Sequence, residues 1–482
     1  MKRRIVVVGA GIAGLSAAYR AHRLAQEAGL DVEVSVLEAG ARAGGVIETA
    51  EQSGCTMELG PDSIVTEKPW ARALCEEIGL EERIIGTRGE FRKSFVALGR
   101  TLHPIPEGFF MMAPTRLAPF VGTRLFTWPA KLRMAADLVL PRRSDGADES
   151  LASFVRRRLG SQALERAAQP MVGGVYTADP EKLSLRATMP RFIEMERKHR
   201  SLILGLMESQ RGGARAAARA EGVASGPRYS LFISLDRGLS VLPRRLVEIL
   251  PAASIRTNTI VERIEHDDGR WKVYTLDECI DADAVCIATP AYAASRLVEG
   301  IAPELARSLN LVEYASAATV NLVYRRDDVP HPLDGFGFVV PAVEKRSLLA
   351  CTFSSVKYQQ RAAAGTVLLR AFVGGALFPD AYDQADDKML GGVTRDLGEL
   401  LGIKVAPRDV RIARWPRSMP QYNVGHLERV ARIEEEAGRY ATLALAGSAY
   451  RGVGIPDCVR SGEAAAERLV GAIKRWGQAP AE

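Results

Sequence analysis

The fold is decided by one stretch near the amino terminus, residues 5–14, which reads IVVVGAGIAG. Its first four residues are β-branched and apolar, the composition of a strand that is buried on both faces of a parallel sheet. Gly9, Gly11 and Gly14 then follow with the spacing G-x-G-x-x-G. The first glycine allows a tight turn, the second lets backbone approach a pyrophosphate, and the third allows a helix to pack closely on the strand. The stretch therefore predicts a strand, a phosphate-binding turn and the start of a helix.

The residues that follow complete a dinucleotide-binding unit. A helix is expected from Ile12 to Ala28, because apolar residues recur at helical spacing and Gly29 can end it. A second strand is expected over Val32–Leu37, and Glu38 at its end can accept hydrogen bonds from a ribose. A signal peptide is disfavoured, since three glycines would interrupt its apolar core. The candidate binding residues here are Gly9, Ala10, Gly11, Ile12, Ala13, Gly14, Glu38 and Ala39.

The composition is that of a globular protein with a mild positive charge. The chain has 482 residues, enough for about three domains, and 64 basic against 58 acidic residues give a net charge of +6. This charge is too small and dispersed to predict nucleic-acid binding. Six scattered cysteines without C-x-x-C or clustered histidines predict neither a disulfide framework nor a metal site. Without a long uninterrupted apolar run, a spanning helix is not expected, and a cytoplasmic location is favoured.

A second glycine-rich segment follows Glu38. Arg42 precedes Gly44-Gly45, which suits a second pass of backbone along the dinucleotide with the guanidinium near phosphate; a plain surface loop is the alternative. The run from Glu38 into Arg42-x-Gly44-Gly45 resembles the flavoproteins with two dinucleotide-binding domains. The segment ELGPDS, residues 58–63, is similar to the one that passes beside the flavin ring in porphyrinogen oxidases. This resemblance implies that FAD contacts Gly60, Pro61, Asp62 and Ser63.

Two further segments resemble the protoporphyrinogen and coproporphyrinogen oxidases: GGVYTADPEKLS at 173–184 and WPRSMPQYNVGH at 415–426. Ala178 stands where the family has glycine, and alanine is strained at positive φ. The resemblance covers nearly the whole chain and is closest to the soluble bacterial coproporphyrinogen III oxidase type. It implies that Gly173 and Gly174 contact substrate and that Trp415 contacts FAD. His426 is expected to be a structural hydrogen-bonding residue rather than a general base.

The carboxy-terminal segment GSAYRGVGIPDC, residues 447–458, leads into a predicted helix. Glycines before a helix N-terminus let backbone amides approach the end of the flavin on which reduction accumulates negative charge. We expect FAD to be held here without a covalent bond. The candidate residues are Gly447, Ser448, Val453, Gly454 and Ile455, and Val261 is either close to the adenine or an ordinary inward strand residue.

Residues 91–143 mix aromatic and methionine side chains with arginines and lysines. Three interpretations remain open: a helical core with solvated cations, a surface for a greasy anionic ligand, or a surface that touches a bilayer. Cations that are expected to receive substrate propionates include Lys68 and Arg92, with Lys93 and Lys198 as further candidates. A helix over Leu151–Leu164 is expected to carry Arg156, Arg157 and Arg158 on a solvated face.

The predicted fold class is α/β: a Rossmann-like FAD-binding domain assembled from discontinuous segments, a mixed-sheet substrate domain and an inserted helical domain. The FAD-binding domain takes residues 1–90, 228–295 and 440–482. The helical domain, which faces substrate or membrane, takes 91–210. A flexible loop over 211–227 follows it, and the substrate domain takes 296–439.

The resemblance implies an oxygen-dependent oxidation of coproporphyrinogen III to coproporphyrin III in haem biosynthesis, by hydride transfer from meso carbons to FAD with hydrogen peroxide as product. Protoporphyrinogen IX is the main alternative substrate. A flavin amine oxidase, a carotenoid desaturase and a non-catalytic FAD-binding protein are more distant alternatives. No residue is identifiable as a catalytic base. Expected partners are the tetrapyrrole and oxygen, with a homodimer and peripheral contact with the inner face of the membrane left open.

Overall fold

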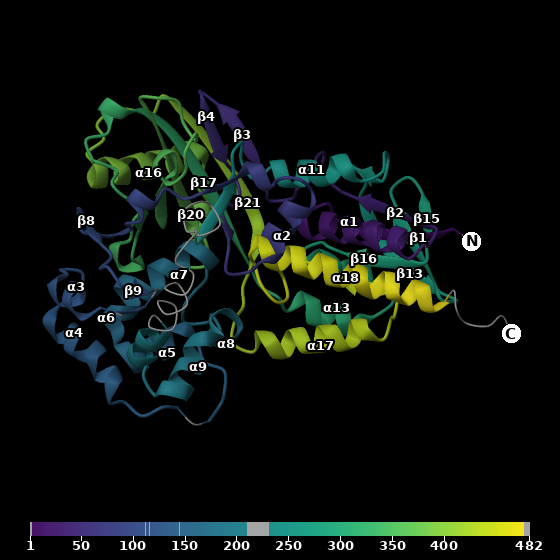
Figure 1. Cartoon of the computed structure of the whole chain (residues 1–482), viewed down its shortest axis with the longest axis horizontal. Coiled ribbons are helices and arrows are strands. Elements are labelled where there is room, and N and C mark those ends of the chain that lie inside the picture. Colours follow the sequence, from purple (N-terminus) through teal and green to yellow (C-terminus); the bar gives the residue numbers. More distant parts are fainter. Residues whose placement is uncertain (1, 111, 115, 144, 210–230, 477–482) are drawn as a thin grey trace, which may run out of the picture.

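The computed structural model describes residues 2–110, 112–114, 116–143, 145–209 and 231–476. The loop that the sequence predicts over 211–227 lies outside these residues. Figure 1 shows a long molecule with both described ends at one extremity and a group of short helices at the other.

A parallel five-stranded sheet forms the centre of the half that carries both ends of the chain (Figure 1). Its order is β12-β2-β1-β16-β22, so the amino-terminal strand lies in the middle, between the next strand in the sequence and a strand from a distant part of the chain. This sheet confirms the predicted α/β fold with a Rossmann-like unit built from separate segments. The strands are β1 (Arg3–Val8), β2 (Val32–Leu37), β12 (Ile255–Arg256), β16 (Ala284–Ile287) and β22 (Leu443–Leu445).

Helices cover one face of this sheet, and a small antiparallel sheet with further helices covers the other. The first face packs against α1 (Ile12–Glu27), α2 (Trp70–Glu77), α11 (Val241–Ile249) and α18 (Ile455–Trp476). The second packs against β13 (Val261–Asp267), β14 (Arg270–Thr275), β15 (Cys279–Ala282), α12 (Ala291–Val298), α13 (Pro303–Asn310) and α17 (His426–Gly438).

Helices α1 and α18 lie close together because glycine stands at their crossing. A Cβ at Gly462 would overlap the Ala13 carbonyl oxygen, so a side chain there would push the helices apart. Two small antiparallel sheets lie beside this half: β3 (Thr49–Gln52) with β4 (Cys55–Glu58), and β5 (Ile64–Val65) and β6 (Ile84–Gly86) on either side of β11 (Phe232–Leu235).

A mixed seven-stranded sheet forms the second half, in the order β21-β17-β20-β19-β18-β7-β8. Strand β7 pairs with β18 in parallel, and the other pairs are antiparallel. The segment 91–210 therefore begins with two strands of this sheet before its helices. The strands are β7 (Phe95–Leu98), β8 (Thr101–Pro104), β17 (Tyr314–Arg325), β18 (Gly337–Val339), β19 (Ala350–Phe353), β20 (Thr366–Gly374) and β21 (Asp409–Pro420), with α14 (Ser354–Lys357), α15 (Pro379–Asp383) and α16 (Asp386–Leu401) packed nearby.

The elements between Phe109 and His199 form the helical unit. This unit has its own apolar core, which includes Phe154 and Phe192. A helix expected over Leu151–Leu164 ends at Leu159, because Gly160 adopts a φ of +92°. The elements are β9 (Phe109–Phe110), β10 (Ala113–Pro114), α3 (Leu117–Gly122), α4 (Trp128–Ala135), α5 (Leu151–Leu159), α6 (Ser161–Ala163), α7 (Gln169–Tyr176), α8 (Leu185–Thr188) and α9 (Pro190–His199). Thr177, and not Ala178, takes the left-handed conformation after α7, with a φ of 48°, so Ala178 is not strained.

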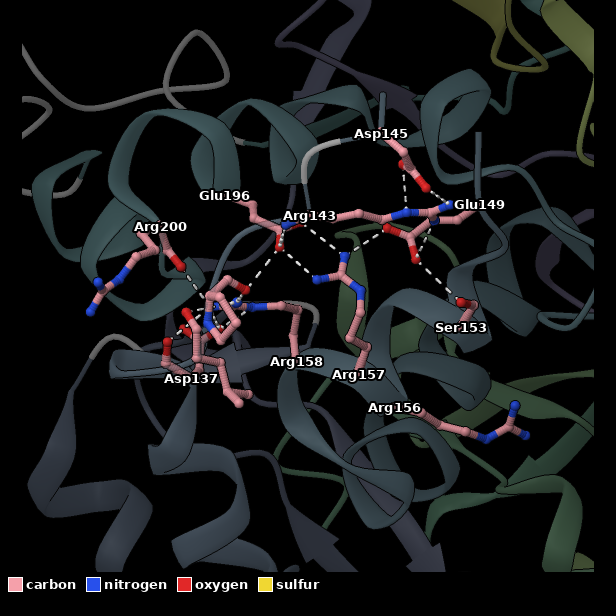
Figure 2. Close-up of polar contacts among 12 residues, drawn as sticks. Asp137, Arg143, Asp145, Glu149, Ser153, Arg156, Arg157, Arg158, Glu196 and Arg200 are labelled. Atoms are coloured by element: carbon pink, nitrogen blue, oxygen red, sulfur yellow. Dashed lines mark hydrogen bonds and ion pairs between the residues drawn. The ribbon is translucent and has the colours of Figure 1, made fainter. Parts of the chain in front are cut away.

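The expectation that the arginines of α5 are solvated is wrong for Arg158, and Arg157 is half-buried in the same ion-pair network. Arg158 is fully buried, and its Nε donates to Asp137 Oδ1 at 2.7 Å. Arg157 donates to Glu149 at 2.7 Å and to Glu196 at 2.6 Å, as Figure 2 shows. The three acidic partners come from outside α5, so helical periodicity alone could not reveal the pairing. The network ties α5 to α9 and to the chain that precedes it.

Candidate functional site

The turn after β1 has the geometry that its glycines predict. Gly9 adopts a φ of +101°, and a Cβ at Gly14 would overlap the Gly9 carbonyl oxygen. A Cβ at Gly11, by contrast, would meet no atom within 4 Å. Two of the glycines are therefore required by the fold itself, whereas Gly11 faces open space at the N-terminus of α1. This is where the fingerprint places a pyrophosphate.

Glu38 holds the end of β2 against this turn. Its carboxylate accepts the backbone N–H of Ala10 at 2.7 Å and that of Gly40 at 2.8 Å. Each carboxylate oxygen retains acceptor capacity beyond one hydrogen bond, so the side chain can also receive ribose hydroxyls. Ala39 is exposed beside it. Glu38 thus has a structural contact in addition to the predicted ligand contact.

The second glycine pair packs directly on the first turn. The Gly44 N–H donates to the Ala10 carbonyl at 2.8 Å, and a Cβ at Gly45 would lie 3.2 Å from Gly11 Cα. Arg42 braces its own loop, because its Nη2 donates to the Gly45 carbonyl at 2.7 Å and to Glu48 at 2.6 Å. The structure therefore brings Gly44 and Gly45 to the predicted phosphate path and gives the Arg42 guanidinium protein partners.

The backbone of residues 58–63 crosses the junction between the two halves of the molecule. The Leu59 carbonyl accepts hydrogen bonds from Trp415 Nε1 and Thr319 Oγ1, each at 2.8 Å. The next carbonyl, that of Gly60, accepts from Arg370. Trp415 therefore fixes the segment that was predicted to pass beside the flavin ring.

A buried charge cluster lies under this segment, although no spacing in the sequence indicates it. Lys357 Nζ lies 2.9 Å from Asp62 Oδ2, and Arg370 Nη1 lies 3.7 Å from the same carboxylate oxygen. Burial opposes ionisation of Asp62, but these two cations hold the pKa of its carboxyl well below its usual range. Ser63 donates to Asp62 at 2.6 Å and accepts from Lys357 at 2.8 Å. Asp62 is thus an ionised, fully engaged carboxylate.

The carboxy-terminal glycines form a turn that precedes α18. Gly447 and Gly452 adopt positive φ angles of +128° and +153°, and a Cβ at Gly452 would overlap the Asp457 carboxylate. Ser461 Oγ accepts the Gly447 N–H at 3.1 Å. Ser448, Val453 and Gly454 are half-buried in this turn, and buried Ile455 begins the helix. The amides at this N-terminus carry partial positive charge.

Lys68 forms an ion pair with the first turn of α18, so its charge already has a protein partner. Its Nζ lies 2.8 and 2.6 Å from the two oxygens of Asp457, a nearly buried side chain. Arg92 is exposed just before β7, which pairs with β18. Helix α7, with Gly173 and Gly174, packs against the same strand β18. Val261 begins β13 and packs against the core below the five-stranded sheet.

The geometry fits a bound dinucleotide flavin. Open space lies beside Gly11 at the N-terminus of α1 and beside Gly447 in the turn before α18, and the Glu38 carboxylate lies at the end of the second strand. Thr289 Oγ1, whose side chain would lie against a Cβ at Gly9, is buried and has no hydrogen-bond partner. No helix among the described residues is long and apolar enough to cross a membrane. Nor do those residues contain a group of three metal-ligating side chains.

Fold and site together define an FAD-dependent oxidoreductase. The family model described as flavin containing amine oxidoreductase matches residues 12–470, and the chain belongs to that family. It is 35% identical to the coproporphyrinogen III oxidase of Bacillus subtilis (strain 168), with 96% of this chain and 97% of that protein covered. It is 31% identical to the protoporphyrinogen oxidase of Bos taurus, with 98% and 99% covered.

Solved structures agree with this assignment of the fold. A crystal structure from Exiguobacterium sp. 255-15, described as a candidate protoporphyrinogen oxidase, matches with a TM-score of 0.84 and 33% identity over 98% of this chain and 99% of that one. The cyclohexylamine oxidase of Brevibacterium oxydans IH-35A matches with a TM-score of 0.69 and 16% identity over 98% of this chain and 100% of that one, a likeness of fold alone.

Proposed function

We propose that this protein oxidises coproporphyrinogen III to coproporphyrin III in haem biosynthesis, with FAD as the hydride acceptor and oxygen as the final oxidant. The observation that carries the proposal is end-to-end similarity to coproporphyrinogen III oxidases. Three bacterial enzymes of that name are 32–36% identical over 96–98% of the chain. Protoporphyrinogen IX is the second candidate substrate, because the similarity to the bovine protoporphyrinogen oxidase is nearly as high.

FAD is assigned to the two glycine turns, the one after β1 and the one before α18. Glu38 receives the adenosine ribose, Gly9, Gly11 and Gly14 line the pyrophosphate path, and the turn over 447–455 receives the flavin ring. Bound FAD supplies hydride acceptance, and the protein supplies orientation and electrostatics. The partial positive charge at the start of α18 then stabilises negative charge on the ring.

The substrate is assigned to the space between the flavin and the helical unit, with Gly173 and Gly174 lining it and Arg92 binding a propionate. Lys68 contributes less to propionate binding than a lone lysine would, because Asp457 already neutralises it at 2.6 Å. Arg92→Ala is therefore expected to raise KM for coproporphyrinogen several-fold with little change in kcat, whereas the matched change Arg237→Ala, also at an exposed arginine, leaves both unchanged. Equal KM values for the two variants would contradict this assignment.

A single-turnover measurement tests the hydride step directly. The purified yellow protein is mixed with coproporphyrinogen III without oxygen, and the flavin absorbance near 450 nm is followed together with porphyrin fluorescence. We expect the flavin absorbance to bleach on mixing and to return when air is admitted. Unchanged absorbance with either porphyrinogen would overturn the proposed reaction.

We further propose that helices α3 and α4 contact an anionic membrane surface. Trp128 and Leu132 on α4 are 62% and 70% exposed, Val121 on α3 is 49% exposed, and Val139, four residues after α4, is 72% exposed. Of the four cations between residues 108 and 136, Lys131 is buried with its Nζ on the Val121 and Thr123 carbonyls and Arg116 pairs with Glu107. Arg124, which is exposed, and the half-buried Arg133 are the cations left to face lipid. Apolar side chains flanked by cations suit an interface with anionic lipid. These helices lie at the end of the molecule opposite both described termini (Figure 1).

Vesicle flotation tests this contact. The protein is expected to float with vesicles rich in phosphatidylglycerol and to float less with phosphatidylcholine alone. Leu132→Ser should lower the bound fraction several-fold, because it removes an apolar side chain from the lipid contact. Leu276→Ser is the matched control, since Leu276 is 66% exposed in the other half of the molecule. Equal flotation of the two variants would contradict the proposed surface.

A homodimer stays a prediction from the sequence.

A further inference from the structure

The family-like segment QYNVGH, residues 421–426, lies against the turn that precedes α18. The Tyr422 hydroxyl donates to the Ser448 carbonyl at 2.6 Å and accepts the Gly452 N–H at 2.7 Å. The hydroxyl therefore joins Ser448 to Gly452, which lie four positions apart in the turn. Tyr422 is only 2% exposed, and burial holds the pKa of its hydroxyl well above its usual value. The hydroxyl stays neutral and can both donate and accept.

A second ring supports the same turn. The His426 ring stacks on Tyr422 with centroids 3.8 Å apart and planes 14° from parallel. Its Nε2 lies 2.8 Å from the Tyr450 carbonyl oxygen and donates to it. Three alternate residues, Ser448, Tyr450 and Gly452, are thus held through their backbone by two stacked side chains.

The other side of this segment contacts the helical unit. The Ser184 N–H donates to the Tyr422 carbonyl, and the Val424 N–H donates to the Lys182 carbonyl, each at 2.8 Å. Asp148 joins these two segments, because its carboxylate accepts hydrogen bonds from Ser184 Oγ at 2.7 Å and from the Gly425 N–H at 3.2 Å. The two segments that resemble porphyrinogen oxidases are therefore hydrogen-bonded to each other, although more than 230 residues separate them.

We propose that Tyr422 is a positioning residue that couples the helical unit to the flavin-binding turn. Its backbone is fixed by residues 182–184, and its hydroxyl sets the Ser448–Gly452 backbone. A movement of the helical unit on substrate binding would thereby displace the turn that receives the flavin ring. This inference rests on the proposed placement of FAD at residues 447–455.

The test compares Tyr422→Phe with Tyr440→Phe. The first variant retains the ring stack but removes the hydroxyl that joins the half-buried Ser448 carbonyl and Gly452 N–H. The second removes a hydroxyl that donates to the Ile301 carbonyl at 2.7 Å, away from the turn. We expect Tyr422→Phe to bind FAD roughly tenfold more weakly or worse. Its bound FAD should have a lower midpoint potential, since the amides at α18 are less well placed to stabilise the reduced form. Tyr440→Phe should match the wild type in both properties.

The coupling to the helical unit is tested separately with Asp148→Ala and the matched exposed change Asp145→Ala. Asp148→Ala should shift the midpoint potential in the same direction as Tyr422→Phe, by a smaller amount, while Asp145→Ala should not. The proposal is overturned if Tyr422→Phe is indistinguishable from Tyr440→Phe, or if Asp148→Ala is indistinguishable from Asp145→Ala. A failure of the proposed function would look different, because the wild type itself would then bind no FAD or form no porphyrin.

Discussion

Glu38 has a structural contact and a proposed ligand contact, and two substitutions test the roles of its charge and of its acceptor oxygens. Its carboxylate accepts two backbone N–H groups and, in the proposed complex, the ribose hydroxyls. Glu38→Gln keeps an acceptor oxygen but loses the charge, while Glu38→Ala removes every acceptor. We expect FAD affinity to fall about tenfold in the first variant and at least about a hundredfold in the second, because hydrogen bonds to a charged group contribute about 1.5–3 kcal/mol each. Fluorescence of released FAD measures both. Equal affinity in Glu38→Ala and the wild type would contradict the site.

His426 is expected to make the folded state sensitive to acid. Burial lowers the pKa of its imidazole from 6.5 to about 4, and its Nδ1 is buried without a partner. The unfolded chain therefore takes up a proton that the folded protein does not, so stability falls as pH drops from about 6.5 to 4.

His426→Gln should remove this contribution to the pH dependence. The loss of unfolding free energy between pH 7 and pH 5 should be smaller in the variant by about 2 kcal/mol, as linkage of a single proton with this shift predicts. Urea unfolding of the apoprotein at the two pH values measures it. The same pH dependence in both proteins would mean that the pKa of His426 does not change on folding, and would contradict its lowered pKa.

Substitutions at Gly14 and Gly11, two of the three glycines in the turn between β1 and α1, are predicted to have different effects. Gly14→Ala places a methyl on the Gly9 carbonyl oxygen and should destabilise the apoprotein by about 1–3 kcal/mol, the usual cost of overpacking. Gly11→Ala meets no protein atom, so the apoprotein should melt as the wild type does. Its FAD affinity should nevertheless fall at least about tenfold, because the methyl enters the pyrophosphate path. Wild-type affinity in Gly11→Ala would show that the pyrophosphate passes elsewhere.

The buried ion network between α5 and α9 is predicted to stabilise the helical unit. Asp137 accepts from Arg158, from Ser201 Oγ at 2.6 Å and from the Ile203 N–H at 3.1 Å. Asp137→Ala leaves the Arg158 guanidinium buried without its carboxylate, which typically costs about 3–5 kcal/mol. Thermal unfolding should show this loss. The control Asp145→Ala, at an exposed carboxylate, should have no comparable effect, and equal melting of the two variants would contradict the role of the network.

Across the whole molecule, the sequence predicted best what depends on local backbone. The strand β2 has the expected bounds, and the helix α1 begins at the expected residue and ends one residue before Ala28, because apolar periodicity and terminal glycines act within one element. The first turn and the turn before α18 could be located for the same reason, since each needs glycine at particular positions.

Contacts between distant side chains could not be predicted in this way. The pairing of Asp62 with Lys357 and that of Lys68 with Asp457 join residues about 300 and 390 positions apart. The Tyr422 hydroxyl has partners in another loop, and its motif indicated a family without indicating a contact. Periodicity placed the arginines of α5 on a polar face, and only the fold shows that acids from other segments enclose that face. No spacing in the sequence carries such information.

We propose that the whole molecule is an FAD enzyme whose substrate is a tetrapyrrole with four propionates. The most direct test is to measure kcat/KM for coproporphyrinogen III and for protoporphyrinogen IX in air, with porphyrin fluorescence and hydrogen peroxide recorded together. We predict that both products form in proportion and that kcat/KM is higher for coproporphyrinogen III. A higher value for protoporphyrinogen IX would reverse the substrate assignment, and the absence of porphyrin from both would contradict the account.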